Sequence, residues 1–282
     1  MAKSRTTLPR DPNKKVRPAG WQIFMVGFFL FYMLVPIIST YVFSVATRWD
    51  RTILPEGYTL EFYKRALEAS YFTITLRNSL ILSLACVLVS LFLIVPTVYW
   101  VQTRLAKAKP LLDILMILPF GIPTVVLALA LVQVYNFRPL ARSPFLLIGA
   151  VVIYSMPFMY RPVSNAIQAI DAHVLTEAGQ SLGANIIQVL SKIIIPNILP
   201  GILSGSLLVF STVFAEYTLT SLIVGARFKT FPLLLVEFTR INGNVAAAFS
   251  VISFTIAWLG SILILWVGTM GYARRTKSIQ VR

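Results

Sequence analysis

Residues 171–202, DAHVLTEAGQSLGANIIQVLSKIIIPNILPGI, decide the fold, because they form a polar, patterned interruption in a chain that is otherwise mostly apolar. Their pattern predicts two short amphipathic helices joined by a glycine turn. We expect the Asp171 side chain to cap the first helix and Gly183 to end it in the left-handed conformation. We expect Asn185 to cap the second helix and Pro196 to break or redirect it before the next apolar run.

Apolar residues in both expected helices recur at the spacing of one helical face. In the first helix these are Val174, Leu175, Ala178 and Leu182, and in the second they are Ile186, Val189, Leu190 and Ile193. Two such helices held between membrane spans would form a protruding knob with an apolar face. That face needs another surface to cover it.

The composition places the whole chain in a membrane. It has 282 residues, of which 57% are hydrophobic and 12% charged, and its mean hydropathy is +0.79. A soluble domain is about 45–50% apolar and about 25% charged. The formal net charge of +15 is consistent with a nucleic-acid partner, but the basic residues lie mainly at the tails and between apolar runs. The positive-inside rule accounts for that distribution better, so we expect no nucleic-acid partner.

Six apolar runs predict an all-α polytopic membrane protein with six transmembrane helices. They are residues 21–47, 78–103, 114–137, 143–160, 201–215 and 245–272. We divide the chain into a cytoplasmic tail (1–20), a first transmembrane helix (21–47), an external loop with an interfacial helix near 60–67 (48–71), a core with five spans (72–272) and a cytoplasmic tail (273–282).

The topology that we expect has both termini in the cytoplasm. A cleaved signal peptide is the alternative for the first run, but this run is too long for a signal peptide and no small-residue cleavage pattern follows it. With the N-terminus inside, a moderate majority of the 25 Lys and Arg residues face the cytoplasm, as the positive-inside rule requires. Residues 171–196 then lie on the cytoplasmic side.

Two features inside the apolar runs are candidates for a solute path. Residues 118–123 (LPFGIP) carry Pro119 and Pro123, which break or bend a membrane helix where the freed carbonyls face protein or a wet cavity; a simple packing kink is the alternative. Glu216, followed by Tyr217, interrupts the fifth run. A carboxylate at membrane depth costs several kcal/mol unless it is paired. It would either favour a cationic solute, such as a polyamine, or bond to a neighbouring span for structure.

Enzyme chemistry finds no support in the residues. The single cysteine, Cys86, lies in an apolar run, and the single histidine, His173, has no partner for a metal site, so we interpret it as a surface or docking residue. No catalytic constellation is apparent, and no G-x-x-x-x-G-K-[ST] motif for ATP is present. A secondary transporter or channel would usually carry several intramembrane charges, and by our count only Glu216 qualifies.

Residues 177–196 resemble the EAA loop of bacterial ABC-importer permeases. The family pattern is E-A-A, three residues, G, nine residues, I-x-L-P. This chain has Glu177, Ala178 and Gly179, then Gly183 and Ala184, then 193–196 (IIIP) ending at Pro196. Gly179 replaces the second Ala of the pattern and costs up to about 1 kcal/mol in a helix, which predicts a less rigid loop helix. An ordinary interfacial helix pair in another membrane protein is the alternative.

Three further segments resemble the same family. They are residues 76–79 (LRNS), 118–123 (LPFGIP) and 156–162 (MPFMYRP). The resemblance covers about residues 70–270 and implies a MetI-like permease core preceded by one extra helix. Residues 214–220 (FAEYTLT) and 230–232 look closest to the spermidine/putrescine, iron(III) and aminoethylphosphonate branch.

The resemblance also implies a function. The chain would be a permease subunit in the bacterial inner membrane and would form half of a solute path with a second permease subunit, identical or paralogous. Two ATPase subunits would bind and hydrolyse ATP, an external solute-binding protein would deliver the solute, and no cofactor would sit on this chain. The loop would couple to the ATPase, with Glu177 as a polar anchor and Ala178 and Gly183 permitting close approach. We expect a small charged solute, a polyamine before iron(III) or a phosphonate.

Overall fold

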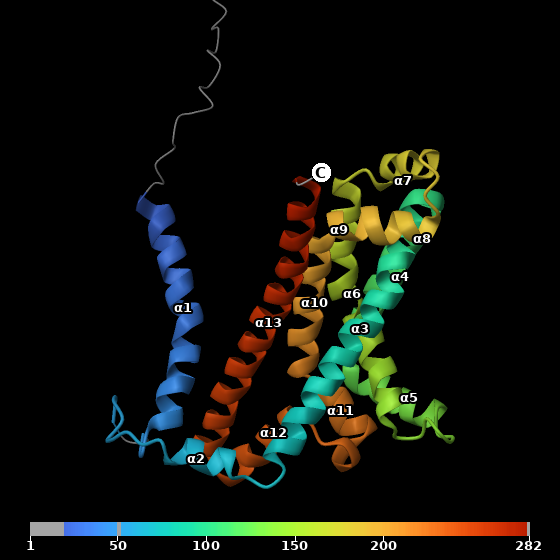
Figure 1. Ribbon diagram of the computed structural model, residues 1–282. Coiled ribbons are helices and arrows are strands. Elements are labelled where there is room, and N and C mark those ends of the chain that lie inside the picture. Colours follow the sequence, from blue (N-terminus) through green and yellow to red (C-terminus); the bar gives the residue numbers. More distant parts are fainter. Residues whose placement is uncertain (1–19, 50–51, 281–282) are drawn as a thin grey trace, which may run out of the picture.

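The computed structural model describes residues 20–49 and 52–280, with side chains described as far as Trp266 (Figure 1). The expected cytoplasmic tail at 1–19 lies outside these residues, and so does the very end of the expected tail at 273–282. In the described part of the chain the regular structure is helical, and the strand pairing found there is a single bridge between Ala46 and Tyr58.

Four helices are long and apolar enough to cross a membrane by themselves. They are α1 (Gly20–Val45), α3 (Phe72–Arg104), α6 (Pro144–Ala169) and α13 (Gly243–Gln280). Two further candidates are bent pairs of helices, each of which is a broken span or a re-entrant loop. In one, Ala106–Gly121, which contains α4 (Lys109–Ile117), meets α5 (Thr124–Val134) at 96°; in the other, Ile186–Asn197 meets α10 (Leu199–Phe214) at 75°. With each bent pair counted as one crossing, the described chain has the six that the apolar runs predict.

The structure differs from the sequence prediction in where some helices end. α6 does not stop near Arg161 but continues to Ala169, because a charge marks where a helix meets water and does not by itself end the helix. The third apolar run is not one straight span, since the chain turns sharply between α4 and α5. α13 continues to Gln280, so residues 273–280, expected as a tail, are helical.

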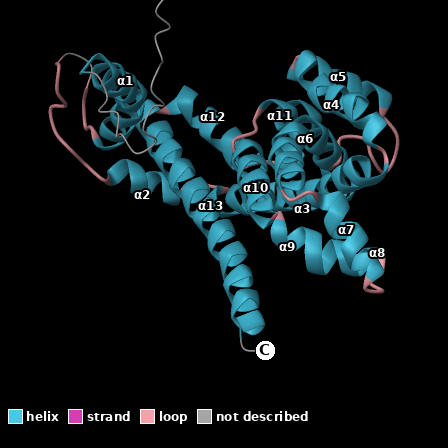
Figure 2. Cartoon of the chain, turned by 90° about the horizontal axis from the view of Figure 1, so that it is seen from above, coloured by secondary structure: helices cyan, strands magenta, loops and turns pink. Residues whose placement is uncertain are grey.

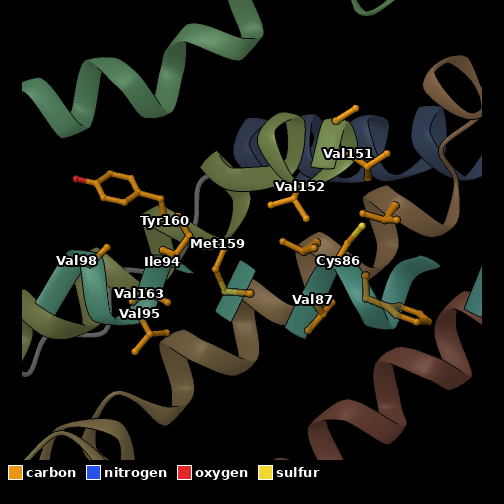
Figure 3. Close-up of a cluster of buried hydrophobic side chains, with 14 of the residues drawn as sticks. Cys86, Val87, Ile94, Val95, Val98, Val151, Val152, Met159, Tyr160 and Val163 are labelled. Atoms are coloured by element: carbon orange, nitrogen blue, oxygen red, sulfur yellow. The ribbon is translucent and has the colours of Figure 1, made fainter. Parts of the chain in front are cut away.

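α3, α6 and α10 pack together as the centre of the molecule. Seen from above, α13 lies between this group and α1 (Figure 2). Buried aliphatic side chains of α3 and α6 meet there, and Cys86 is fully buried among them (Figure 3). Gly201 and Gly205 let α10 approach α6 closely, since a Cβ on Gly201 would lie 2.5 Å from the Cβ of Ala166. Their spacing predicts such close contact.

A second cluster of buried residues joins α2 (Glu61–Leu67) and α12 (Phe231–Ile241) to α13. Phe231 stacks edge-on against Phe72 and Phe249. α12 is also held by α3, because the Ser79 hydroxyl accepts a hydrogen bond from the Phe231 backbone N–H at 2.8 Å. The short helix expected near 60–67 is therefore present, and an apolar cluster covers its inner face.

The two ends of the bundle carry different elements. The start of α1, the end of α13 and helices α7 and α8 lie at one end, which we call the α7 end (Figure 1). Helices α2, α11 and α12 lie at the other end, the α12 end (Figure 1). α1 packs mainly on α13 near the α12 end, where the Asn244 side chain donates to the carbonyls of Phe43 and Ala46. The remaining length of α1 exposes apolar side chains, as a lipid-facing helix does.

Candidate coupling loop and solute path

The loop at the α7 end consists of four short helical pieces. They are α7 (Ala172–Ser181), α8 (Ile186–Gln188), the π-helical segment η3 (Val189–Ile194) and α9 (Ile195–Asn197). Gly183 has φ +82° and ends α7 in the left-handed region, as predicted. Asn185 caps α8 as predicted: its side-chain oxygen accepts from the Gln188 N–H while the Gln188 side chain accepts from the Asn185 N–H, both at 2.9 Å.

The prediction for Asp171 is wrong, since its side chain makes no capping hydrogen bond. Asp171 itself adopts the left-handed conformation, with φ +46°. A capping side chain needs an extended backbone at its own position to reach the first free N–H groups. Here the backbone of Asp171 is used to turn the chain out of α6 and into α7, so it cannot also serve as a side-chain cap.

The apolar stripe predicted for α7 is divided between two faces. Leu175 packs against the core, whereas Val174, Ala178 and Leu182 are exposed, Leu182 by 89%. We call these three residues the exposed ridge. The face of α7 that packs inward carries small residues instead, namely the buried Ala172, Thr176 and Gly179. The α7 end therefore presents an apolar ridge that nothing in the described chain covers.

Gly179 allows the returning chain to pack directly on α7. A Cβ at this position would lie 2.8 Å from the Ile193 Cδ1 and 3.1 Å from the Val189 Cγ2. The glycine that replaces the second Ala of the EAA pattern thus has a packing reason. Ala184, on the far side of the turn, donates its N–H to the Gly179 carbonyl at 3.0 Å.

Glu177 and Pro196 occupy opposite ends of the loop. The Glu177 side chain is 67% exposed, and its Oε1 lies 3.6 Å from the Nδ1 of His173, which is also exposed. Its carboxylate therefore points to solvent, where another surface could reach it. Pro196 lies in α9, directly before the 75° bend at Ile198 that starts α10, so the chain is redirected there as predicted.

Pro119 and Pro123 lie in the sharp turn between α4 and α5. Pro119 is buried, while Pro123 is exposed and stands directly before the first turn of α5. Between them the Phe120 ring packs edge-on against Tyr154 and Phe158 of α6, with centroids 5.9 and 5.5 Å away. The 96° change of direction breaks the crossing rather than kinking it. Whether these prolines meet the solute stays a prediction.

Glu216 lies between α10 and the short helix α11 (Thr218–Ile223). Its Oε1 accepts from the Leu219 N–H at 2.8 Å, and its Oε2 accepts from both the N–H and the hydroxyl of Thr220 at 2.9 Å. Both oxygens are thus used to hold the start of α11. These bonds are local, to residues three and four positions ahead, and not to a neighbouring span as the structural alternative expected. Contact of Glu216 with a solute stays a prediction.

Tyr217 lines a cavity of about 230 Å³ at the α12 end. The same cavity contains Lys229, Glu237 and Arg240, and Lys229 forms an ion pair with Glu237. Lys229 also lies over the Tyr71 ring, 5.3 Å from its centroid. We call this the α12-end cavity.

A second polar cavity, about 270 Å³, lies between α4 and α6. The Tyr160 hydroxyl donates to the Asp113 carboxylate across it, and Lys109 and Arg161 also line it. Among the described residues, no ion pair joins either cation to Asp113. We call this the α4–α6 cavity.

Asp113 is a carboxylate that the apolar runs do not include. It lies in Ala106–Gly121, one half of a bent helix pair that is long and apolar enough to count as a span. Asp113 directly precedes the apolar run at 114–137, whereas the helix starts at Lys109. A hydropathy run excludes the first charge that it meets, which is why the sequence reasoning missed this residue. Within the described residues, no cluster of three or more His, Cys, Asp or Glu side chains could hold a metal ion.

The fold defines the class of protein. The structure superimposes on a chain of a bacterial ABC transporter involved in the import of the acidic polysaccharide alginate, with a TM-score of 0.64 and 18% identity over 89% of this chain and 95% of that chain. It also superimposes on a chain of the MetNI methionine ABC transporter in an inward-facing conformation, with a TM-score of 0.55 and 16% identity over 71% and 94%. This is the MetI-like permease fold, with one helix added before the core.

The family follows from the sequence comparisons. Residues 103–242 match the family described as binding-protein-dependent transport system inner membrane component, and the chain belongs to this family of ABC-importer permeases. It is 27% identical over 266 residues to the spermidine/putrescine transport system permease protein PotB of Escherichia coli (strain K12), covering 86% of this chain and 94% of PotB. PotB of Haemophilus influenzae is 27% identical over 216 residues, covering 70% and 74%.

Proposed function

We propose that this ABC-importer permease couples to a cytoplasmic ATPase through residues 171–196 and imports a small charged solute, most favourably a polyamine. The observation that carries the coupling is the exposed ridge of Val174, Ala178 and Leu182. At the end of a membrane bundle such a ridge would lie in water. Burying a leucine side chain contributes about 1.5–3 kcal/mol, so the ridge is suited to seat in a cleft of a partner.

The orientation belongs to the same proposal. The start of α1 and the end of α13 lie at the α7 end (Figure 1), so a cytoplasmic loop would place both ends of the described chain on the cytoplasmic side. The partners would be two ATPase subunits, which bind and hydrolyse ATP, and a second permease subunit. An external solute-binding protein would meet the α12 end. Closure of the ATPases would displace the loop, and rigid-body movement would open the path to the outside.

The choice of solute rests on two lines of support. The PotB relatives are named as spermidine/putrescine permeases. The α4–α6 cavity contributes Asp113, and an intramembrane carboxylate is by default a functional residue. A polyamine ammonium group could donate a hydrogen bond to this carboxylate.

A phosphonate is the second candidate. Both polar cavities also contain one lysine and one arginine: Lys109 and Arg161 in the α4–α6 cavity, Lys229 and Arg240 in the α12-end cavity. Arginine binds phosphate-like oxygens with paired hydrogen bonds. A solute with an anionic group would therefore also find partners in either cavity.

The experiment is uptake by the complete transporter in proteoliposomes. Labelled spermidine, putrescine, 2-aminoethylphosphonate and iron(III) are offered with and without ATP, together with the cognate binding protein. We expect ATP-dependent uptake of spermidine or putrescine. Uptake that does not require ATP would contradict the coupling, and uptake of the phosphonate or iron(III) alone would contradict the polyamine assignment.

A charge-neutralising variant tests the α4–α6 cavity. Asp113→Asn keeps the shape of the side chain and is expected to lower polyamine uptake about tenfold or more, since a hydrogen bond to a charged group contributes about 1.5–3 kcal/mol. The matched control is Glu68→Gln, a carboxylate at the end of α2 whose side chain is 66% exposed, and it should transport normally. Equal uptake by both variants would refute a solute role for Asp113.

A further inference from the structure

A buried hydrogen bond fastens α7 to the end of α3. The Tyr99 hydroxyl lies 2.9 Å from the Thr176 hydroxyl, although the two residues are 77 positions apart. Tyr99 is 1% exposed and Thr176 is 3% exposed. A contact of this kind, remote in sequence and closed to water, fixes how two elements sit on each other.

The direction of this bond follows from the number of hydrogens available. Thr176 donates its only hydroxyl hydrogen to the Ala172 carbonyl at 2.6 Å. Tyr99 must therefore be the donor to Thr176. Removal of the Tyr99 hydroxyl leaves no buried donor without a partner, so Tyr99→Phe is a mild change that the fold can tolerate.

α7 is attached to α3 rather than to α6, its neighbour in the chain. At the exposed edge Arg104, the last residue of α3, donates to the Gln180 side chain at 3.3 Å. Among the described residues, no side-chain hydrogen bond or ion pair joins α7 to α6. α6 is instead tied to α3, through Gln102 and the Ser164 hydroxyl at 2.8 Å.

α3 carries a second set of remote bonds at its other end. The Asn78 side chain donates to the Lys229 carbonyl at 2.9 Å, and the Ser79 hydroxyl accepts from the Phe231 N–H at 2.8 Å. Lys229 lines the α12-end cavity. The 33 residues of α3 span about 50 Å, so this helix runs from the α7 end to the α12 end (Figure 1). Through Lys229 it also contacts the wall of the α12-end cavity.

Pro96 increases the dependence of the end of α3 on the hydrogen bond between Tyr99 and Thr176. It lies inside α3, three residues before Tyr99, and it removes one backbone hydrogen bond from the helix. The last two turns of α3 therefore depend more on side-chain contacts for their position. The Tyr99–Thr176 bond is the buried polar contact that ties these turns to α7.

We propose that Tyr99 is a positioning residue that transmits movement of the coupling loop to α3, and through α3 to the α12-end cavity. This inference rests on the proposed coupling of residues 171–196 to the ATPase. In it α3 is the strut between the two ends of the molecule. Without the hydroxyl bond, the ATPase still moves α7, but α7 shifts relative to α3. The movement then no longer reaches the α12-end cavity.

The test is the number of ATP molecules hydrolysed per solute imported, measured on the complete transporter in proteoliposomes with whichever of the four solutes above the wild type imports. Tyr99→Phe is expected to keep its ATPase rate within twofold of wild type while uptake falls at least fivefold. Thr176→Val should uncouple to the same degree, and Thr176→Ser, which keeps the hydroxyl, should restore coupling. The double variant should be no more uncoupled than Thr176→Val alone, because both single changes remove the same Tyr99–Thr176 bond, and Thr176→Val also removes the bond to the Ala172 carbonyl.

The matched control is Thr103→Val. Thr103 is buried one turn along the same helix, and its hydroxyl bonds only within α3, to the Tyr99 carbonyl at 2.7 Å. This variant should keep the wild-type ratio. A wild-type ratio in Tyr99→Phe overturns the proposal. Equal uncoupling in Thr103→Val, or a parallel loss of ATPase activity and uptake in Tyr99→Phe, overturns it as well.

A second measurement does not depend on transport. Hydrogen–deuterium exchange of the purified chain in detergent should show residues 175–179 exchanging at least tenfold faster in Tyr99→Phe than in Thr103→Val. Unchanged exchange would overturn the fastening even if the ATPase coupling is correct. A wild-type complex without ATP-dependent uptake, combined with the expected exchange, would refute the proposed function and leave the fastening of α7 to α3 in place.

Discussion

Replacing Gly201 with alanine is expected to weaken the packing of α10 on α6. The new Cβ would lie 2.5 Å from the Ala166 Cβ and 2.6 Å from the Pro162 carbonyl oxygen. Favourable contacts between carbon atoms lie at about 3.5–4.0 Å. Neither a methyl group nor a backbone carbonyl can rotate aside, so α10 would have to retreat from α6 by about 1 Å.

The magnitude follows from two opposing effects. Overpacking of an interior contact costs about 1–3 kcal/mol, while alanine gains up to about 1 kcal/mol over glycine in helix propensity. We expect a net loss of about 1–2 kcal/mol in the free energy of unfolding. Gly205→Ala should cost less, because the nearest atom there is the Met159 sulfur at 2.7 Å, which a flexible side chain can move.

The assay is unfolding by sodium dodecyl sulfate in mixed micelles, followed by tryptophan fluorescence. The control is Gly149→Ala in α6, where nothing lies within 4 Å of the added Cβ, and it should be as stable as wild type or slightly more stable. The expected order of stability is Gly149→Ala, then Gly205→Ala, then Gly201→Ala. Gly201→Ala as stable as Gly149→Ala would refute the argument from close helix approach.

Three further substitutions probe the loop and the solute path. Leu182→Ser should leave the unfolding free energy unchanged, because the side chain is 89% exposed, but should weaken copurification of the ATPase; unchanged copurification would exclude the exposed ridge as the docking surface. Gly183→Leu forces a branched side chain into φ +82°, a strain of about 1–2 kcal/mol, and should lower solute-stimulated ATP hydrolysis without abolishing membrane insertion. Full stimulation in that variant would contradict the docking of the loop. Glu216→Gln should impair solute uptake while assembly with the ATPase stays intact. Normal uptake by this variant would exclude a solute role for Glu216 and would show that it serves only to hold α11.

The sequence predicts the local backbone conformation in the loop correctly where that conformation does not depend on contacts with distant residues. Gly183 and Asn185 behave as expected, because a left-handed turn and a capping box depend on neighbouring residues alone. The capping prediction for Asp171 is wrong for the opposite reason. The backbone conformation of Asp171 depends on the angle between α6 and α7, which distant contacts decide. Asp113 was missed because a hydropathy run was ended at the first charged residue.

The amino-acid sequence by itself determined that the chain crosses a membrane as helices, since a backbone in lipid must satisfy its own hydrogen bonds and the apolar runs have the required length. It also determined the position of the loop and its turn. Only the tertiary structure decided which face of α7 stays exposed and which residues meet Asp113. It alone joined Tyr99 to Thr176. The physical reason is that helical periodicity specifies a face relative to its own axis, whereas contacts between residues 77 positions apart depend on how whole helices pack.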